Sequence, residues 1–245
     1  MKPFTRAAYI SLSILLFTAT ATAGEVKIAV AANFTAAMKQ IAKGFEQTTG
    51  HKTRISYGST GKLYAQILHR APFEVFLSAD SERPQLLVKK RLADQQFTYA
   101  IGKLALWSSD PIRDVSKAGL KRGDFKRIAL ANPKTAPYGA ASVKVMEQLG
   151  VAKALRPKWV RGDNIAQTHQ FIATGNAEVG FVALAQIVLN NQGKHWVIPQ
   201  DLYEPIHQDA VLLTKGKSNP AASAFLAYLK SDEARKVIGS YGYGH

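Results

Sequence analysis

The chain has 245 residues, no cysteine and a formal net charge of +15, from 32 Lys and Arg against 17 Asp and Glu. The missing cysteines exclude disulfides and argue against a zinc or iron site, so a large hydrophobic core must hold the fold. The basic residues are scattered, without a basic run or interleaved aromatic motif, which argues against a nucleic-acid-binding protein. The positive charge either raises the encounter rate of an anion or reflects ordinary solvated lysines.

Residues 1–23 are predicted to form a secretory signal peptide. A basic start with Lys2 and Arg6 precedes an apolar run over residues 7–17, and Ala21-Thr22-Ala23 has the small-x-small pattern of a cleavage site. The alternative, a transmembrane anchor, is disfavoured because the run is shorter than the ~20 residues that span a bilayer. We therefore expect a periplasmic protein that begins near Gly24 and carries a charge of +13, since 15 minus the two lost cations leaves 13.

Short apolar runs then alternate with helical patterns, which is typical of an α/β fold with mostly parallel sheets. Strands are predicted at residues 26–31, 53–57, 74–77, 127–130, 179–182 and 196–198. Helices are predicted around residues 38–45 and 63–68, at 141–149, and from Asn164, Pro220 and Ser231. Two long extended stretches are predicted at residues 97–108 and 208–214.

These two extended stretches divide the chain into two similar α/β halves and predict a hinged, two-lobed molecule. The first lobe would comprise residues 24–104 plus 208–245, and the second would comprise residues 105–207. Each lobe would be a mostly parallel sheet flanked by helices, and the two stretches would be hinge crossings. The alternative is one doubly wound domain.

Four turns share one pattern, in which a strand ends, a small polar or glycine-containing turn follows, and a helix begins. They lie at residues 31–35, 57–61, 136–140 and 162–165. Such turns present unpaired backbone N–H groups and the positive end of a helix dipole, and both favour an anion. A single turn of this kind often contains only a helix cap, but four of them, two from each lobe, predict an anion site.

No enzyme motif accompanies these turns. The segment around Ser59 is not a P-loop, because Ser56 stands where the first glycine is needed and Leu63 replaces the Ser or Thr that holds magnesium. It is not a nucleophile elbow either, because Tyr57 occupies a required glycine position. The six histidines show no pair at metal-ligand spacing, so we expect no catalytic residues and no metal held by side chains.

Four segments together resemble successive motifs of the periplasmic molybdate-binding proteins. They are Val30-Ala31-Ala32-Asn33-Phe34, Gly58-Ser59-Thr60-Gly61-Lys62-Leu63, residues 71–80 and residues 133–139. The likeness covers essentially all of the chain after residue 23. It implies the two-lobed periplasmic-binding-protein fold, no cofactor, a molybdate or tungstate ligand held as its oxyanion, the membrane permease of a molybdate ABC transporter as partner, and a monomer.

In that family, hydroxyl and backbone N–H donors hold the oxyanion between the lobes. By position, the resemblance implies ligand-binding roles for Ala32, Asn33, Ser59, Thr60, Tyr138 and Ile165. Whether Ser59 or Thr60 gives the main hydroxyl stays open, and Tyr138 could instead pack at a lobe edge. The chain departs from one branch of the family, because Ala183 occupies the place of a ligand-contacting tyrosine.

A pocket that offers only donors favours a fully deprotonated oxyanion over protonated phosphate, which also needs an acceptor. Asp163 beside the fourth turn could be such an acceptor, but we expect it to cap the helix and point away. The alternatives are a binding protein for sulfate, phosphate or another small solute, and an exported ester hydrolase.

Overall fold

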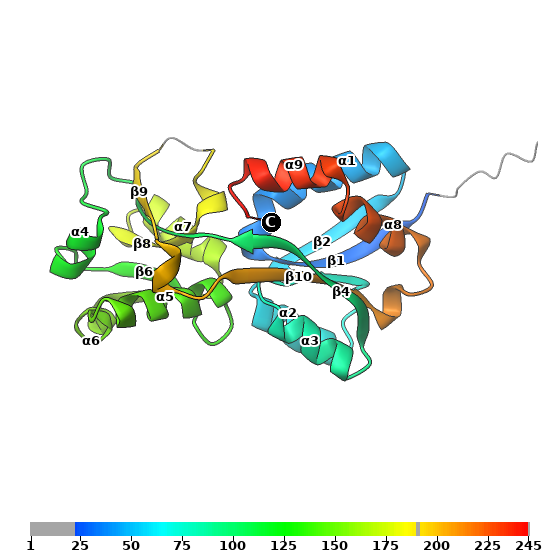
Figure 1. The fold of residues 1–245 in the computed structure, drawn as a ribbon, viewed down its shortest axis with the longest axis horizontal. Helices are drawn as coiled ribbons and strands as arrows, with labels where there is room; N and C mark the ends of the chain where they lie inside the picture. Colours follow the sequence, from blue (N-terminus) through cyan, green and yellow to red (C-terminus); the bar gives the residue numbers. More distant parts are fainter. Residues whose placement is uncertain (1–22, 190–191, 245) are drawn as a thin grey trace, which may run out of the picture.

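The computed structural model describes residues 23–189 and 192–244, which form two lobes, each built on a five-stranded sheet flanked by helices (Figure 1). The predicted two-lobed α/β fold is therefore confirmed. The strands of sheet A, in spatial order, are β2 (Lys52–Gly58), β1 (Glu25–Ala31), β3 (Val75–Leu77), β10 (Ile206–Leu213) and β4 (Ala93–Gly102). Those of sheet B are β7 (Trp159–Gly162), β6 (Ile128–Ala131), β8 (Val179–Ala183), β5 (Leu104–Ser108) and β9 (Lys194–Val197). The predicted signal peptide lies, apart from Ala23, outside the described residues.

Both sheets are mixed, whereas the sequence pattern suggested mostly parallel ones. In sheet A, β1 pairs in parallel with β2 and β3, and β10 pairs antiparallel with β3 and β4. Sheet B repeats the arrangement, with β6 parallel to β7 and β8, and β5 antiparallel to β8 and β9. The chain leaves lobe A, the lobe built on sheet A, along β4 and returns to it along β10, so these two strands run in opposite directions.

Helices cover both faces of each sheet. In lobe A they are α1 (Thr35–Thr49), α2 (Thr60–Leu68), α3 (Glu82–Lys89), α8 (Pro220–Leu229) and α9 (Asp232–Ser240). In lobe B, the lobe built on sheet B, they are α4 (Lys117–Arg122), α5 (Pro137–Gln148), α6 (Ala152–Leu155) and α7 (Ile165–Ala173). Figure 1 shows α1, α8 and α9 on one side of sheet A and α2 and α3 on the other.

The amphipathic pattern of α1 explains its place on sheet A. Ala37, Met38, Ile41 and Phe45 recur at helical spacing, and all are at most 1% exposed in the core beneath α8 and α9. Burying such a side chain contributes about 1.5–3 kcal/mol, so this face fixes the helix against the sheet. The α1 helix begins directly after the short 3-10 helix η1 (Ala32–Phe34), which therefore has a fixed position at the end of β1.

Two strands link the lobes across the middle of the molecule (Figure 1). β4 ends at Gly102, and β5 begins two residues later in the other sheet. The return crossing leads into β10, whose Ile206 pairs with Gly102. The two crossings are therefore paired with one another where the chain passes between the lobes.

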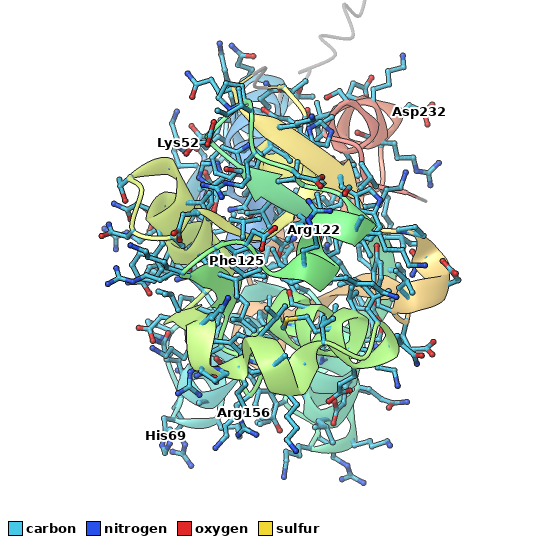
Figure 2. The ribbon with its side chains drawn as sticks, turned by 90° about the vertical axis from the view of Figure 1, so that its left-hand side faces the viewer. Lys52, His69, Arg122, Phe125, Arg156 and Asp232 are labelled. Atoms are coloured by element: carbon cyan, nitrogen blue, oxygen red, sulfur yellow. The ribbon has the colours of Figure 1, made fainter. Side chains whose placement is uncertain are left out.

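Charged side chains are spread over the surface of both lobes. The exposed Lys52, Arg156 and Asp232 point outward at separate places around the molecule (Figure 2). Several cations form ion pairs, for example Lys217 with Asp94 at 2.7 Å. Within the described ranges, no helix combines the length and apolar character needed to cross a membrane.

Candidate functional site

The four predicted turns meet at a small pocket between the lobes, with a cavity volume of about 10 Å³. Its walls come from the ends of β1 and β2 in lobe A and from the starts of α5 and α7 in lobe B. All six predicted site residues line it: Ala32, Asn33, Ser59, Thr60, Tyr138 and Ile165. Each of them is at most 5% exposed, so the pocket is almost closed to solvent.

The first turn offers backbone donors. The η1 helix begins at Ala32, and the first N–H groups of a helix lack intrahelical partners, so the N–H groups of Ala32 and Asn33 are available. The Asn33 side chain is engaged elsewhere, because Nδ2 donates to Gln208 Oε1 at 2.8 Å and to the Tyr243 hydroxyl at 3.1 Å. That hydroxyl donates to the Asn33 carbonyl at 2.9 Å. Both amide hydrogens of Asn33 therefore have protein partners.

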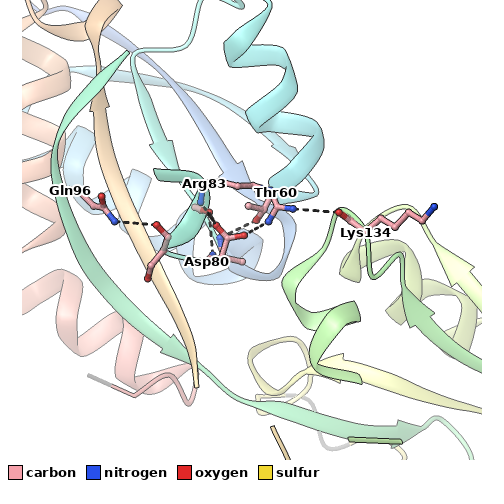
Figure 3. A network of polar contacts seen from close by, with 8 residues as sticks. Thr60, Asp80, Arg83, Gln96 and Lys134 are labelled. Atoms are coloured by element: carbon pink, nitrogen blue, oxygen red, sulfur yellow. Dashed lines mark hydrogen bonds and ion pairs between the residues drawn. The ribbon is translucent and has the colours of Figure 1, made fainter. Parts of the chain in front are cut away.

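The second turn contains an unpartnered hydroxyl. Ser59 occupies the N-cap position of α2, yet its side chain makes no capping bond, and Oγ is buried without a hydrogen-bond partner among the described residues. The Thr60 hydroxyl, in contrast, accepts from the Ala79 N–H at 3.0 Å (Figure 3). A buried hydroxyl without a partner costs free energy, and a ligand that accepts its hydrogen would relieve that cost.

The third turn contributes a neutral phenol. Tyr138 lies in the first turn of α5, and its hydroxyl accepts from Gln208 Nε2 at 3.0 Å. In the described part of the chain this is the only hydrogen bond of that hydroxyl, so its own hydrogen remains available. Burial raises the pKa of the Tyr138 hydroxyl well above its usual range, which keeps it protonated as a donor.

The fourth turn presents the N–H of Ile165. Asn164 is the N-cap of α7, and its Oδ1 accepts from the N–H groups of Ala166 at 2.9 Å and Gln167 at 3.0 Å. The cap does not use the Ile165 N–H, the first of the helix, and Ile165 lines the pocket. The expectation that Asp163 caps this helix is wrong, because Asn164 is the residue that directly precedes it. Asp163 instead pairs with Lys62 Nζ at 2.8 Å, and both side chains are exposed.

The pocket wall contains neither a cationic side chain nor a carboxylate. Its polar groups are hydroxyls and the N–H groups at the starts of helices, whose dipoles add positive potential. Elsewhere in residues 23–189 and 192–244, no group of three or more His, Asp or Glu could hold a metal ion. The site is therefore suited to bind an anion through neutral hydrogen-bond donors.

Three polar contacts join the lobes beside the pocket. The Gly61 N–H donates to the Thr135 carbonyl at 2.8 Å, and Lys62 pairs with Asp163. Arg83 Nη2 donates to the Lys134 carbonyl at 3.4 Å (Figure 3). The approach at Gly61 is close, since a Cβ there would lie 3.0 Å from Thr135 Cα and 3.1 Å from its carbonyl oxygen. Arg83 is held by an ion pair with Asp80. These contacts describe a closed arrangement of the two lobes.

Sequence reasoning missed a group of buried residues behind the pocket. Gln208 on β10 is fully buried and contacts Asn33, Tyr138 and Tyr99. Tyr243 reaches the site from the C-terminal tail, where Gly244 pairs with Ile101 of β4. Gln208 was expected only to begin an extended stretch, and no local pattern reveals contacts between residues so far apart in the sequence.

The chain is similar to known extracellular binding proteins. Residues 26–244 match the family model of the bacterial extracellular solute-binding proteins. The chain is 54% identical to the molybdate-binding protein ModA of Azotobacter vinelandii, over 96% of each chain, and 51% identical to ModA of Rhodobacter capsulatus, over 91% of this chain and 89% of that one. The solved structure of an Azotobacter vinelandii periplasmic molybdate-binding protein matches with a TM-score of 0.86 and 39% identity, over 90% of this chain and 99% of that one.

Proposed function

The chain belongs to the bacterial extracellular solute-binding proteins, together with the molybdate-binding relatives, and from this premise we propose that it captures molybdate between its lobes for an ABC transporter. Because the members of this family bind solutes, the expectation of a binding protein rather than an enzyme is confirmed. Molybdate is then a transported ligand and not a cofactor. Tungstate, which has the same charge and tetrahedral shape, is the second ligand we propose.

The observation that supports this function best is the buried, unpartnered Ser59 Oγ in a pocket without charged side chains. Hydrogen bonds to a charged acceptor are about twice as strong as neutral ones, so a few fixed donors can hold a dianion. Phosphate that retains a proton would bring a donor into a pocket that offers no carboxylate to accept it. This argument favours molybdate and tungstate over phosphate.

We assign the principal hydroxyl to Ser59, because its Oγ is buried without a hydrogen-bond partner among the described residues. The hydroxyls of Thr60 and Tyr138 each accept one hydrogen bond and keep their own hydrogen, so they are further side-chain donors. The remaining donors are the backbone N–H groups of Ala32, Asn33 and Ile165, each near the start of a helix. The contribution of Asn33 comes from its backbone, since both hydrogens of its amide are used within the protein.

Membership in the bacterial extracellular solute-binding proteins and the likeness to a periplasmic molybdate-binding protein support a periplasmic location. The same proposal includes export by a signal peptide at residues 1–23 and a monomeric state. It also includes lobes that divide at residues 104/105 and 207/208. The partner would be the membrane permease of a molybdate transporter.

Isothermal titration of the protein, purified free of bound oxyanion, tests this function. Molybdate, tungstate, sulfate and phosphate are titrated separately in a buffer without phosphate. The proposal expects tight binding of molybdate and tungstate at one site per chain, with weak or absent heats for sulfate and phosphate. Equal or tighter binding of sulfate or phosphate would contradict it.

A further inference from the structure

Gln208 touches a donor from each lobe. It lies on β10, the strand by which the chain returns to lobe A, and it is 0% exposed. Its Oε1 accepts from Asn33 Nδ2 of lobe A at 2.8 Å, and its Nε2 donates to the Tyr138 hydroxyl of lobe B at 3.0 Å. Gly102 of the other crossing leaves room for this contact, since a Cβ there would lie 2.1 Å from the Tyr138 hydroxyl and 2.6 Å from Gln208 Nε2.

The orientation of this amide decides what Tyr138 can offer to the pocket. A phenol has one hydrogen to donate. While Gln208 Nε2 donates to it, that hydrogen stays free for a ligand. If the amide were reversed, Oε1 would face the phenol and accept its hydrogen. Nε2 would then face Asn33 Nδ2, and two donors would point at one another.

The orientation is fixed from the lobe A side. Tyr243 donates its hydrogen to the Asn33 carbonyl and accepts from Asn33 Nδ2, so the Asn33 amide points its other N–H at Gln208. Tyr243 thus fixes the orientation of the Asn33 amide, and the Asn33 amide fixes that of Gln208, which contacts the Tyr138 hydroxyl of lobe B. Linked hydrogen bonds in a buried network strengthen one another, so they restrain its members more than isolated pairs do.

We infer that Gln208 is a specificity-determining residue, which holds the Tyr138 hydroxyl as a donor toward the pocket and so sets the site for a fully deprotonated oxyanion. This inference rests on the proposed function and extends it to a residue outside the pocket wall. Gln208 acts through Tyr138 and is a positioning residue without direct contact to the ligand.

The tyrosines of this network stay protonated near neutral pH. Tyr99 and Tyr138 contact Gln208, Tyr243 contacts Asn33, and burial raises the pKa of each tyrosine above its usual range. The neighbouring Asp209 carboxylate is held on the other side of β10 by Gln96 and Thr98, each at 2.7 Å. A carboxyl group introduced at position 208 would therefore be the titrating group of this network.

Gln208→Glu provides the test, because its protonated form can donate to Tyr138 and accept from Asn33 as the wild-type amide does, whereas its carboxylate can only accept. Burial raises the pKa of such a carboxyl, so binding is measured from pH 5 to pH 9. At the high-pH end the carboxylate accepts the Tyr138 hydrogen and adds negative charge, and molybdate affinity should fall at least tenfold. At the low-pH end affinity should approach that of wild type. Wild type, measured over the same pH range, corrects for protonation of molybdate itself. A loss that does not reverse at low pH, or no loss at pH 9, overturns the inference.

A double-mutant cycle separates the hydrogen bond from the added charge. Tyr138→Phe should weaken molybdate binding about tenfold or more in wild type, but only slightly in Gln208→Glu at pH 9, where the carboxylate already accepts the phenol hydrogen. An equal cost in both backgrounds contradicts the inference. If Gln208→Glu does not fold, Gln208→Met replaces it, again with a smaller cost of Tyr138→Phe expected than in wild type. Failure of wild type to bind molybdate would instead refute the proposed function.

Discussion

Ser59 and Thr60 are neighbours with different tasks. The Ser59 hydroxyl is buried without a partner, while the Thr60 hydroxyl accepts the Ala79 N–H. Sequence alone could not separate them, because both follow the same strand and both are small hydroxyl residues. The difference depends on Ala79, which lies beyond β3 and approaches only in the folded lobe.

Ser59→Ala should weaken molybdate binding by about 1–3 kcal/mol without lowering the free energy of unfolding of the ligand-free protein, since the hydroxyl has no protein partner to lose. Thr60→Val is the matched control. It should lower the free energy of unfolding by about 1 kcal/mol or more, because the Ala79 N–H loses its acceptor. Calorimetric titration and denaturant unfolding measure the two effects. Full affinity in Ser59→Ala would refute the assignment of the principal hydroxyl.

The buried tyrosines predict how stability responds to alkaline pH. Burial raises the pKa of Tyr99, Tyr138 and Tyr243 in the folded protein above the usual value near 10. The unfolded chain therefore loses these protons first, and the stability they contribute is present below pH 10 and falls as the pH rises further. Tyr243→Phe should make this decline shallower. Denaturant unfolding at pH 8 to 11 measures it, and an unchanged slope would contradict the prediction.

At the scale of elements, the sequence predicts the turns well because each is a local pattern of strand end, small residues and helix start. All six candidate residues line one pocket. It misses α3, α4, α6 and β7, which have between four and eight residues and too few positions to show a clear period. The mixed strand directions could not be predicted from the sequence either, because local patterns do not show which strands carry the chain between the lobes.

The close approach of α2 to lobe B gives a prediction for Gly61. Its N–H donates to the Thr135 carbonyl, and a Cβ would crowd Thr135 at 3.0–3.2 Å. Gly61→Ala should oppose lobe closure and weaken molybdate binding by about 1–3 kcal/mol, as overpacking typically does. The free energy of unfolding should stay level or rise, since Ala favours a helix over Gly by about 1 kcal/mol. Wild-type affinity in this variant would show that closure does not depend on the contact.

At the scale of the whole molecule, the excess of positive charge should speed capture of the anion. The formal net charge is +15, and the binding pocket itself contains no charged side chain. Long-range attraction acts on the association rate and is screened by salt, with a Debye length of about 8 Å at 0.15 M. The association rate for molybdate should fall severalfold between 10 and ~300 mM salt, with little change in the dissociation rate. Stopped-flow fluorescence measures both, and a salt-independent association rate would show that the surface lysines are ordinary solvated residues.

The exposed pair of Lys62 and Asp163 is the one ion pair among the contacts that join the lobes beside the pocket. Exposed pairs are worth about 0–1 kcal/mol, so Lys62→Ala should reduce molybdate affinity less than about fivefold. This modest effect contrasts with the larger losses expected at Ser59 and Gly61. A larger loss in Lys62→Ala would move the main source of affinity from the neutral pocket to the charged rim.

The central claim is that neutral donors from four turns hold molybdate between the lobes, and anomalous diffraction at the molybdenum edge tests it most directly. A crystal grown with molybdate should show one strong molybdenum peak in the pocket. Its oxygens should lie within about 3 Å of Ser59 Oγ and of the backbone nitrogen of Ile165. A peak beside Lys or Arg side chains elsewhere, or no peak in a crystal of protein saturated with molybdate, would contradict the account.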